Sequence, residues 1–262
     1  MANQSVPWTR QHTLSAFHLY TLLPFGKLHQ HNSEIKQLAS WQGRTPSSIA
    51  MKLVNFASLD PQITSTGRSG LKGASNQDRA LWLELKSNWD KVAIEAADAY
   101  AQLALSHGLD ADMPLIEDVE PPPLEEGKAR SAVVQVRVNQ ARFRRVVMAT
   151  FDSTCCISGL RHEKLLIASH IVPWSQDSTN RLNPQNGLCL SALHDKAYDI
   201  GLITVLPDYR IRISKKLSDC TDDPFIEETL LRYDNALIRI PRKLKPAPVF
   251  LTSHAKRFGF IS

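Results

Sequence analysis

The sequence has few cysteines, no long hydrophobic run and no internal repeat. Its four cysteines, at positions 155, 156, 189 and 220, include no Cys-x-x-Cys pair, which favours a reduced protein. Every apolar stretch is interrupted by polar residues before the roughly 18 residues that a membrane span needs. The first residues lack the basic and then apolar pattern of a signal peptide. We therefore expect a cytoplasmic protein that does not insert into a membrane.

The composition is typical of a globular protein whose charge is unevenly distributed. Hydrophobic residues make up 43% and charged residues 22% of the 262 residues, which is enough chain for roughly two folded domains. The net charge is +3 over residues 1–109, −7 over 110–126 and +9 over 127–262. Two basic blocks favour a polyanionic partner such as nucleic acid, although a charge excess is more often simply a soluble surface.

Residues 110–130 lie between the two basic blocks and predict a linker. This segment is acidic, contains three consecutive prolines at 121–123 and shows no sustained apolar period, as an extended inter-domain connection does. An ordered loop that wraps one of the domains is the alternative. The sequence thus predicts a first domain over residues 1–109 and a second over 131–262.

The first domain is predicted to be helical, with a helix-turn-helix pattern in its middle. Apolar periodicity predicts a long helix over 78–105. Earlier in the chain, Ser33 can cap a helix that runs to about residue 42, where Gly43 suits the left-handed turn that stops it. Thr45 and Pro46 then open a second helix to about residue 56.

The outward face of that second helix predicts contact with DNA. It carries residue types that contact phosphates and base edges in a major groove: Arg44, Ser47, Ser48 and Lys52. The glycine-rich segment 67–73, with Arg68 and Lys72, is typical of a basic wing. A helical hairpin used only for packing or dimerisation is the alternative, because helix-turn-helix patterns often arise by chance.

The second domain predicts a strand, a loop, a strand and a helix in that order. An amphipathic helix over 139–151 with a basic side precedes them. An apolar strand then covers 165 to about 170, a polar loop covers 175–186, and a short strand covers 187–191. A helix over about 192–200 follows.

Three residues of this segment, His170, Asn186 and His194, resemble the signature of HNH endonucleases. The string from Ala168 to Trp174 and the later His254 are similar to the branch found among restriction endonucleases. The resemblance extends from about residue 136 to 258 and implies a ββα-metal fold for the second domain. We therefore expect an α+β protein whose helical first domain is helix-turn-helix or winged-helix-like.

The resemblance implies a site that hydrolyses phosphodiester bonds with one divalent metal ion, Mg²⁺ or Mn²⁺. His170 would take the proton of the attacking water, and neutral imidazole is available near pH 7 because its ordinary pKa is about 6.5. Asn186 would bridge the loop by hydrogen bonds and orient His170. His194 would bind the metal ion.

Two other residues are candidate metal ligands. One departs from the usual pattern of the family, and the role of the other is open. Ser169 stands where many relatives carry an Asp or His ligand, and its neutral hydroxyl is a poor ligand for a hard cation. Asp199 lies roughly 140° around the helix from His194. It reaches the ion only if the helix ends before Gly201, and otherwise it satisfies backbone groups in a turn. Without Cys-x-x-Cys pairs, a structural zinc ion is not expected.

These observations together predict a restriction-type endonuclease that acts on double-stranded DNA. Dependence on modified bases is a secondary expectation. One site per chain would nick one strand, so cutting both strands would require a homodimer or two successive events. The alternative is a DNA-binding regulator in which the HNH fold has lost its metal, and a secreted nuclease toxin ranks last.

Overall fold

The computed structural model describes residues 7–60, 73–109, 128–218 and 222–262. The chain divides into two compact units, Met1–Val146 and Val147–Ser262. The division falls within helix α7 (Lys128–Thr150), later in the chain than the predicted domain start. Most of the predicted linker lies outside the described residues, and so do two predicted DNA contacts, Arg68 and Lys72.

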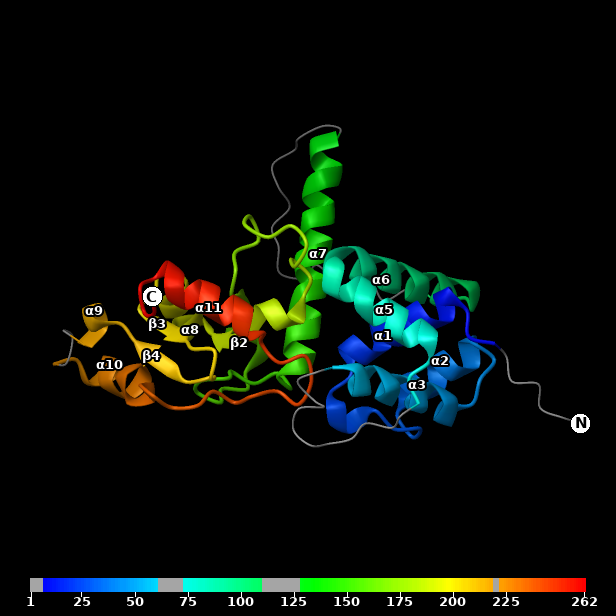
Figure 1. The fold of residues 1–262 in the computed structure, drawn as a ribbon, viewed down its shortest axis with the longest axis horizontal. Helices are drawn as coiled ribbons and strands as arrows, with labels where there is room; N and C mark the ends of the chain where they lie inside the picture. Colours follow the sequence, from blue (N-terminus) through cyan, green and yellow to red (C-terminus); the bar gives the residue numbers. More distant parts are fainter. Residues whose placement is uncertain (1–6, 61–72, 110–127, 219–221) are drawn as a thin grey trace, which may run out of the picture. The chain divides into compact units, whose positions relative to one another are not determined.

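The first unit is an assembly of helices (Figure 1), and its core is rich in aromatic residues. Phe17 lies edge-on to Phe56, with ring centroids 5.4 Å apart, and its ring is 6.1 Å from that of Trp89. Buried aromatic pairs of this geometry contribute beyond the area that they bury. Besides the start of α7, the described elements are α1 (Arg10–Leu22), the 3-10 turn η1 (Phe25–Lys27), α2 (Ser33–Trp41), α3 (Pro46–Leu59), α5 (Asn76–Ser87) and α6 (Trp89–Ser106).

Helices α2 and α3 form the expected hairpin, with one change at its start. Asn32, not Ser33, caps α2, because its side-chain oxygen accepts the backbone N–H groups of Glu34 and Ile35 at 2.8 and 3.1 Å. The turn residue Gly43 has a φ of +61°, which favours glycine. Thr45 caps α3 by accepting the N–H of Ser48 at 3.2 Å.

The prediction that Lys52 faces outward toward DNA is wrong. Its side chain is 4% exposed, and its Nζ donates to the Asp78 carboxylate at 2.7 Å. Asp78 is itself 0% exposed and accepts the backbone N–H of Ser75 at the start of α5. A buried ammonium is stable only when it is paired in this way, so Lys52 joins α3 to α5.

Arg44 also has partners within the first unit. Its guanidinium carbon lies 3.9 Å from the centre of the Trp8 ring, and Nη2 donates to the carbonyl of Pro7 at 2.9 Å. The ammonium of Lys52 lies 4.1 Å from the same ring centre. These cation–π contacts hold the segment before α1 against α3, which gives both cations an internal role.

The long helix predicted over 78–105 is two helices joined at Asn88. The backbone N–H of Asn88 donates to Glu84 at the end of α5, and its side chain accepts the N–H of Lys91 at 3.0 Å. Its extended φ and ψ of −156° and 92° break the helix. A single asparagine thus ends one helix and starts the next, as its preference for N-cap positions allows.

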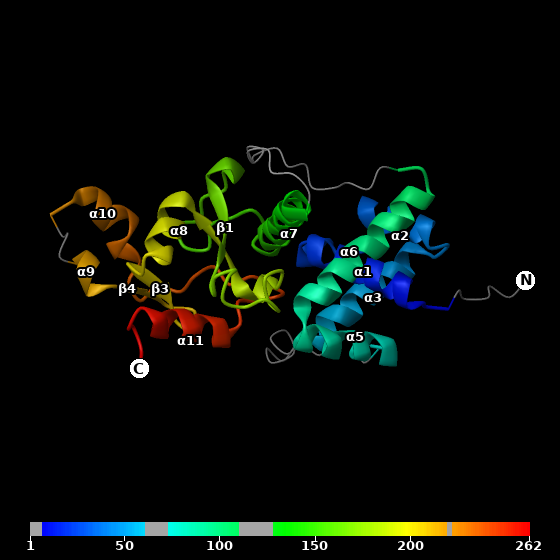
Figure 2. The same cartoon turned by 90° about the horizontal axis from the view of Figure 1, so that it is seen from above.

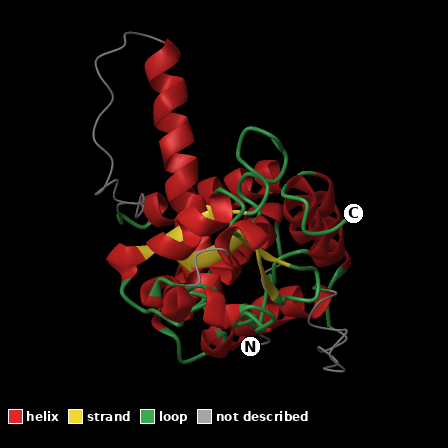
Figure 3. Ribbon diagram, turned by 90° about the vertical axis from the view of Figure 1, so that its left-hand side faces the viewer, coloured by secondary structure: helices red, strands yellow, loops and turns green. Residues whose placement is uncertain are grey.

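The second unit mixes helices with short strands, which are the yellow segments of Figure 3, and the α+β class is confirmed at this level. Among the described residues, no helix has the length and apolar character needed to cross a membrane. After α7 come η2 (Glu163–Leu165), β1 (Leu166–His170), η3 (Pro184–Asn186), β2 (Gly187–Ser191), α8 (Ala192–Asp199), β3 (Ile203–Val205), β4 (Ile211–Ile213), α9 (Lys215–Ser218), α10 (Pro224–Thr229), η4 (Leu231–Tyr233) and α11 (Pro248–Arg257).

Strands β1 and β2 with helix α8 form the expected strand, loop, strand and helix. The two strands pair antiparallel, with His170 opposite Gly187 and Leu166 opposite Ser191. Ser191 ends β2 and caps α8 by accepting the backbone N–H of His194, so the helix starts directly from the strand. Figure 2 shows α8 alongside β1, an arrangement that brings the end of β1 near the helix.

Helix α11 is held against the end of α8 by a tight contact. His254 is stacked on Tyr198, with ring centroids 3.7 Å apart, and its two ring nitrogens lie 2.9 Å from Thr204 Oγ1 and 3.2 Å from the Tyr198 carbonyl. A Cβ on Gly201, whose φ is +71°, would lie 2.1 Å from the Phe258 ring. The close approach therefore requires glycine at this position.

The pKa of His254 is lowered from 6.5 to about 4, chiefly by burial and also by the charge of Arg257, while the hydrogen bond to the Tyr198 carbonyl raises it. Because the unfolded chain takes up this proton first, folding stability should fall between about pH 6.5 and pH 4, by up to about 3 kcal/mol. Urea unfolding at pH 7 and pH 5 should show a smaller loss for His254→Gln than for the unmodified protein. Equal losses would contradict the prediction.

Candidate active site

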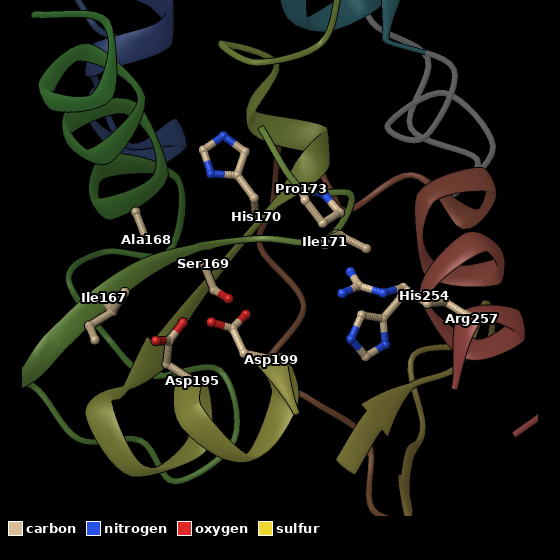
Figure 4. A pocket seen from close by; sticks show the side chains of 10 residues that line it. All are labelled: Ile167, Ala168, Ser169, His170, Ile171, Pro173, Asp195, Asp199, His254 and Arg257. Atoms are coloured by element: carbon tan, nitrogen blue, oxygen red, sulfur yellow. The ribbon is translucent and has the colours of Figure 1, made fainter. Parts of the chain in front are cut away.

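A pocket of about 410 Å³ lies where the end of β1, the turn after it, α8 and α11 meet (Figure 4). Its polar side chains come from β1, α8 and α11, whereas its apolar lining comes from β1 and the turn. The lining residues are Ile167, Ala168, Ser169, His170, Ile171, Pro173, Asp195, Asp199, His254 and Arg257.

His170 is the last residue of β1 and lines the pocket as a half-buried imidazole. Its Nε2 lies 2.9 Å from the carbonyl oxygen of Arg181. A carbonyl only accepts, so Nε2 carries the proton and Nδ1 is the basic nitrogen of the neutral ring. Burial lowers the pKa of His170, although the Arg181 carbonyl and the charge of Asp199 raise it. The ring is therefore a neutral base at pH 7.

Asn186 joins the two sides of the loop that follows His170. Its Oδ1 accepts the backbone N–H of Val172 at 2.8 Å, and its Nδ2 donates to the carbonyls of Val172 and Asn180 at 3.1 and 3.3 Å. Asn180 directly precedes Arg181, whose carbonyl binds His170. The loop-bridging hydrogen bonds expected of Asn186 are present. They join the backbone of Val172, which follows His170 closely in the chain, to the backbone of Asn180, which precedes the Arg181 carbonyl.

Three more side chains of this loop form a chain of hydrogen bonds that the sequence analysis missed. Asp177 accepts from Asn180 Nδ2 at 2.8 Å, and Asn180 Oδ1 accepts from Asn183 Nδ2 at 2.8 Å. Asn183 Oδ1 in turn accepts the N–H of Gln185 at 3.0 Å. Together with Asn186, these residues recur at every third position, a spacing visible in the sequence. They stiffen the segment that presents the Arg181 carbonyl.

Ser169 points to the opposite side of β1 from His170, because successive strand residues alternate. Figure 4 shows its hydroxyl directed toward the carboxyl groups of Asp195 and Asp199. The two aspartates are four residues apart and share one face of α8. Ser169 Oγ is buried and forms no hydrogen bond of ordinary geometry with the described residues. Three oxygen-bearing side chains thus converge on one side of the pocket.

The Asp195 carboxyl is half-buried, and this burial raises its pKa. The Asp199 carboxylate also raises it, whereas the nearby Ser169 hydroxyl and Lys196 lower it. The charge of Asp199 disfavours the charged form of Asp195, and a bound cation would offset this repulsion. Within the parts of the chain that the structure describes, however, no group of three or more His, Cys, Asp or Glu side chains is placed to hold a metal ion.

The structure does not bring His194 to the pocket, which corrects its predicted grouping with His170. His194 is 4% exposed, its Nδ1 lies 2.6 Å from Ser191 Oγ, and its Nε2 lies 3.0 Å from the Thr229 carbonyl. Both ring nitrogens are therefore engaged within the fold. One residue corresponds to about 100° of helix rotation, so Asp195 faces the pocket and His194 does not.

Asp195 is one of the site residues that the sequence analysis missed. Its i,i+4 spacing from Asp199 indicates that the two side chains share a helix face. The sequence analysis considers only the spacing between His194 and Asp199. Ser169 and Asp199 lie in the pocket with it. Arg257 was also missed, because it belongs to a helix far along the chain.

Comparison with protein families identifies the segment that holds this site. Residues 155–206 match the family model of the HNH endonucleases. Over these residues the chain is similar to an HNH endonuclease domain, and this segment is referred to as the HNH domain. The HNH domain contains β1, β2, α8 and β3, and so includes His170, Asn186 and both pocket aspartates. A search of curated proteins finds no match to the chain. His254 and Arg257 lie beyond the matched segment, although they line the same pocket.

Proposed function

We propose that the protein is a restriction-type DNA endonuclease that hydrolyses phosphodiester bonds with His170 as general base. The observation that carries the proposal is that one pocket is lined both by a proton acceptor and by a cluster of oxygen-bearing side chains. A neutral imidazole, oriented by a backbone carbonyl, lies on one side of β1, and an oxygen cluster lies on the other. Hydrolysis of a phosphodiester requires both a proton acceptor and compensation of negative charge.

The oxygen cluster fits a divalent cation better than the predicted set with His194. Asp195 and Asp199 would hold the ion, with the Ser169 hydroxyl as a weaker third ligand, since Mg²⁺ and Mn²⁺ prefer hard oxygen ligands. The Ser169 hydroxyl, which is buried and directed toward both carboxyl groups, supports this assignment. A bound ion supplies charge neutralisation at the phosphate and at the departing oxygen.

The residues of the chain account for the proton transfer. His170 Nδ1 accepts a proton from water as the water oxygen bonds to phosphorus and the bond to the 3′ oxygen breaks. The Arg181 carbonyl, which accepts from Nε2–H, stabilises the imidazolium that forms. Asn186 keeps that carbonyl in place through the neighbouring Asn180. The departing 3′ oxygen takes up a proton from solvent, and the imidazolium returns its proton to solvent, which restores the neutral base.

The first unit supports a proposed role in DNA recognition only in part. Ser47 is exposed and Ser48 half-buried at the start of α3, where backbone and hydroxyl groups suit phosphate contact. Arg44 and Lys52 are engaged by Trp8 and, for Lys52, by Asp78. We propose double-stranded DNA as substrate, action in the cytoplasm, preference for modified bases, and a homodimer for cutting both strands.

The test is incubation of the purified protein with plasmid and with phage DNA carrying modified bases, each with Mg²⁺, Mn²⁺ or a chelator. Cleavage is expected only with metal, and His170→Ala should abolish it while DNA binding is retained. Faster cleavage of the phage DNA would support dependence on modification. No cleavage of any DNA, with binding retained, would instead favour the regulator that has lost its metal.

A further inference from the structure

We propose that Arg257 binds the phosphate group that is cleaved, so that α11 completes the nuclease site from outside the family segment. This inference rests on the proposed nuclease function and names the group that receives the substrate. Arg257 is exposed and lines the pocket at the end of α11. In Figure 4 its guanidinium lies beside the turn at Ile171 and Pro173, on the same side of β1 as Asp199.

The charge of Arg257 has no carboxylate partner in the part of the chain that the structure describes. Among the described ion pairs, none joins its guanidinium to a carboxylate, although two aspartates line the same pocket. The guanidinium carbon lies 4.9 Å from the centre of the Phe258 ring, in a cation–π contact. That contact supports the side chain but leaves its five N–H donors for another acceptor.

A phosphodiester is the hydrogen-bond acceptor that fits the charge and the donors of this pocket. Asp195 and Asp199 would repel an approaching phosphate, so a fixed cation is needed on the substrate side. The planar guanidinium binds two phosphate oxygens at once, in a geometry that an ammonium cannot reproduce. Charge also builds up on those oxygens as water attacks, so the contact strengthens in the transition state.

The position of Arg257 is fixed by the contacts that dock α11. His254, one helical turn earlier, is stacked on Tyr198 and bonded to Thr204. The Phe258 ring, one residue later, fills the space that Gly201 leaves open. Because residues on both sides of Arg257 are anchored to the HNH domain, its side chain enters the pocket from a rigid base.

The neighbouring Lys256 provides a matched control. It is exposed and carries the same charge on the same helix, but it does not line the pocket. Arg257→Ala, Arg257→Lys and Lys256→Ala are compared with the unmodified protein after circular dichroism has shown that each is folded. We measure the kcat and KM of plasmid cleavage with Mn²⁺, and the affinity for a short DNA duplex with chelator over a range of salt concentrations.

Arg257→Ala should lower kcat by about 10²-fold, and Arg257→Lys should recover only part of this loss. The slope of log affinity against log salt should decrease by about one for Arg257→Ala, as expected for one lost phosphate contact. Lys256→Ala should change kcat by less than about twofold. A kcat and a salt slope for Arg257→Ala equal to those of Lys256→Ala would overturn the inference.

The two measurements separate this inference from the proposed function. If the unmodified protein binds DNA but does not cleave it, the proposed function fails, and the salt slope alone decides whether Arg257 contacts phosphate. If it cleaves DNA while Arg257→Ala matches the unmodified protein in both measurements, only the inference fails. Absence of DNA binding by the unmodified protein overturns both.

Discussion

Replacing Asp195 with Ala is expected to lower metal-dependent DNA cleavage by about 10³-fold, because the charge neutralisation that a metal ion supplies amounts to several kcal/mol. Asp195 lines the pocket beside Ser169 and Asp199. It is half-buried, so the substitution should leave the fold intact. Calorimetric titration with Mn²⁺ should show weakened binding alongside the lost cleavage.

His194→Gln is the informative comparison. His194 bonds to Ser191 and to the Thr229 carbonyl and faces away from the pocket. This variant should unfold at a lower urea concentration yet bind Mn²⁺ with nearly unchanged affinity. The reverse pattern, in which a folded His194→Gln loses Mn²⁺ and Asp195→Ala keeps it, would restore His194 as the ligand.

Removal of Lys52 should destabilise the first unit by about 3–5 kcal/mol, since it leaves Asp78 as an unpaired buried charge. Asp78 is fully buried and also accepts the Ser75 N–H that starts α5. Lys52→Met keeps most of the apolar stem and isolates the effect of the charge. Urea unfolding, followed by the fluorescence of the tryptophans in this unit, measures the change.

An exposed ion pair of the same unit provides the control. Lys91 and Glu95 are 4.0 Å apart, and the Lys91 side chain is 70% exposed, so Lys91→Met should change stability by less than about 1 kcal/mol. If both variants changed the free energy of unfolding equally, the buried ion pair would contribute no more to stability than the exposed one. DNA-binding losses in Lys52 variants should be interpreted as loss of folding unless stability is measured first.

The order and the boundaries of β1, β2 and α8 were predictable because their signals are local. Short apolar runs define the strands, and the serine before α8 caps it within one turn. The rotation of α8 about its axis was not predictable in the same way. It depends on which face packs against β1, and this packing places Asp195 rather than His194 in the pocket lining.

Long-range pairing explains the failures in the first unit. Lys52 has the spacing of an outward residue, but its partner Asp78 is 26 residues further along the chain, beyond any local pattern. Arg44 is likewise engaged by Trp8, which precedes α1. The helical hairpin itself was predictable, because Gly43, Thr45 and Pro46 act within their own turns.

The docking of α11 also has a consequence for the order in which the protein folds. Strands β1 and β2 and helix α8 meet through short-range contacts, which form early and at little entropic cost. The contact of His254 with Tyr198 spans 56 residues, so the loop between them must close before Arg257 reaches the pocket. We therefore expect the general base to be in place before the arginine arrives, and competence for cleavage to be among the last properties that the folding chain acquires.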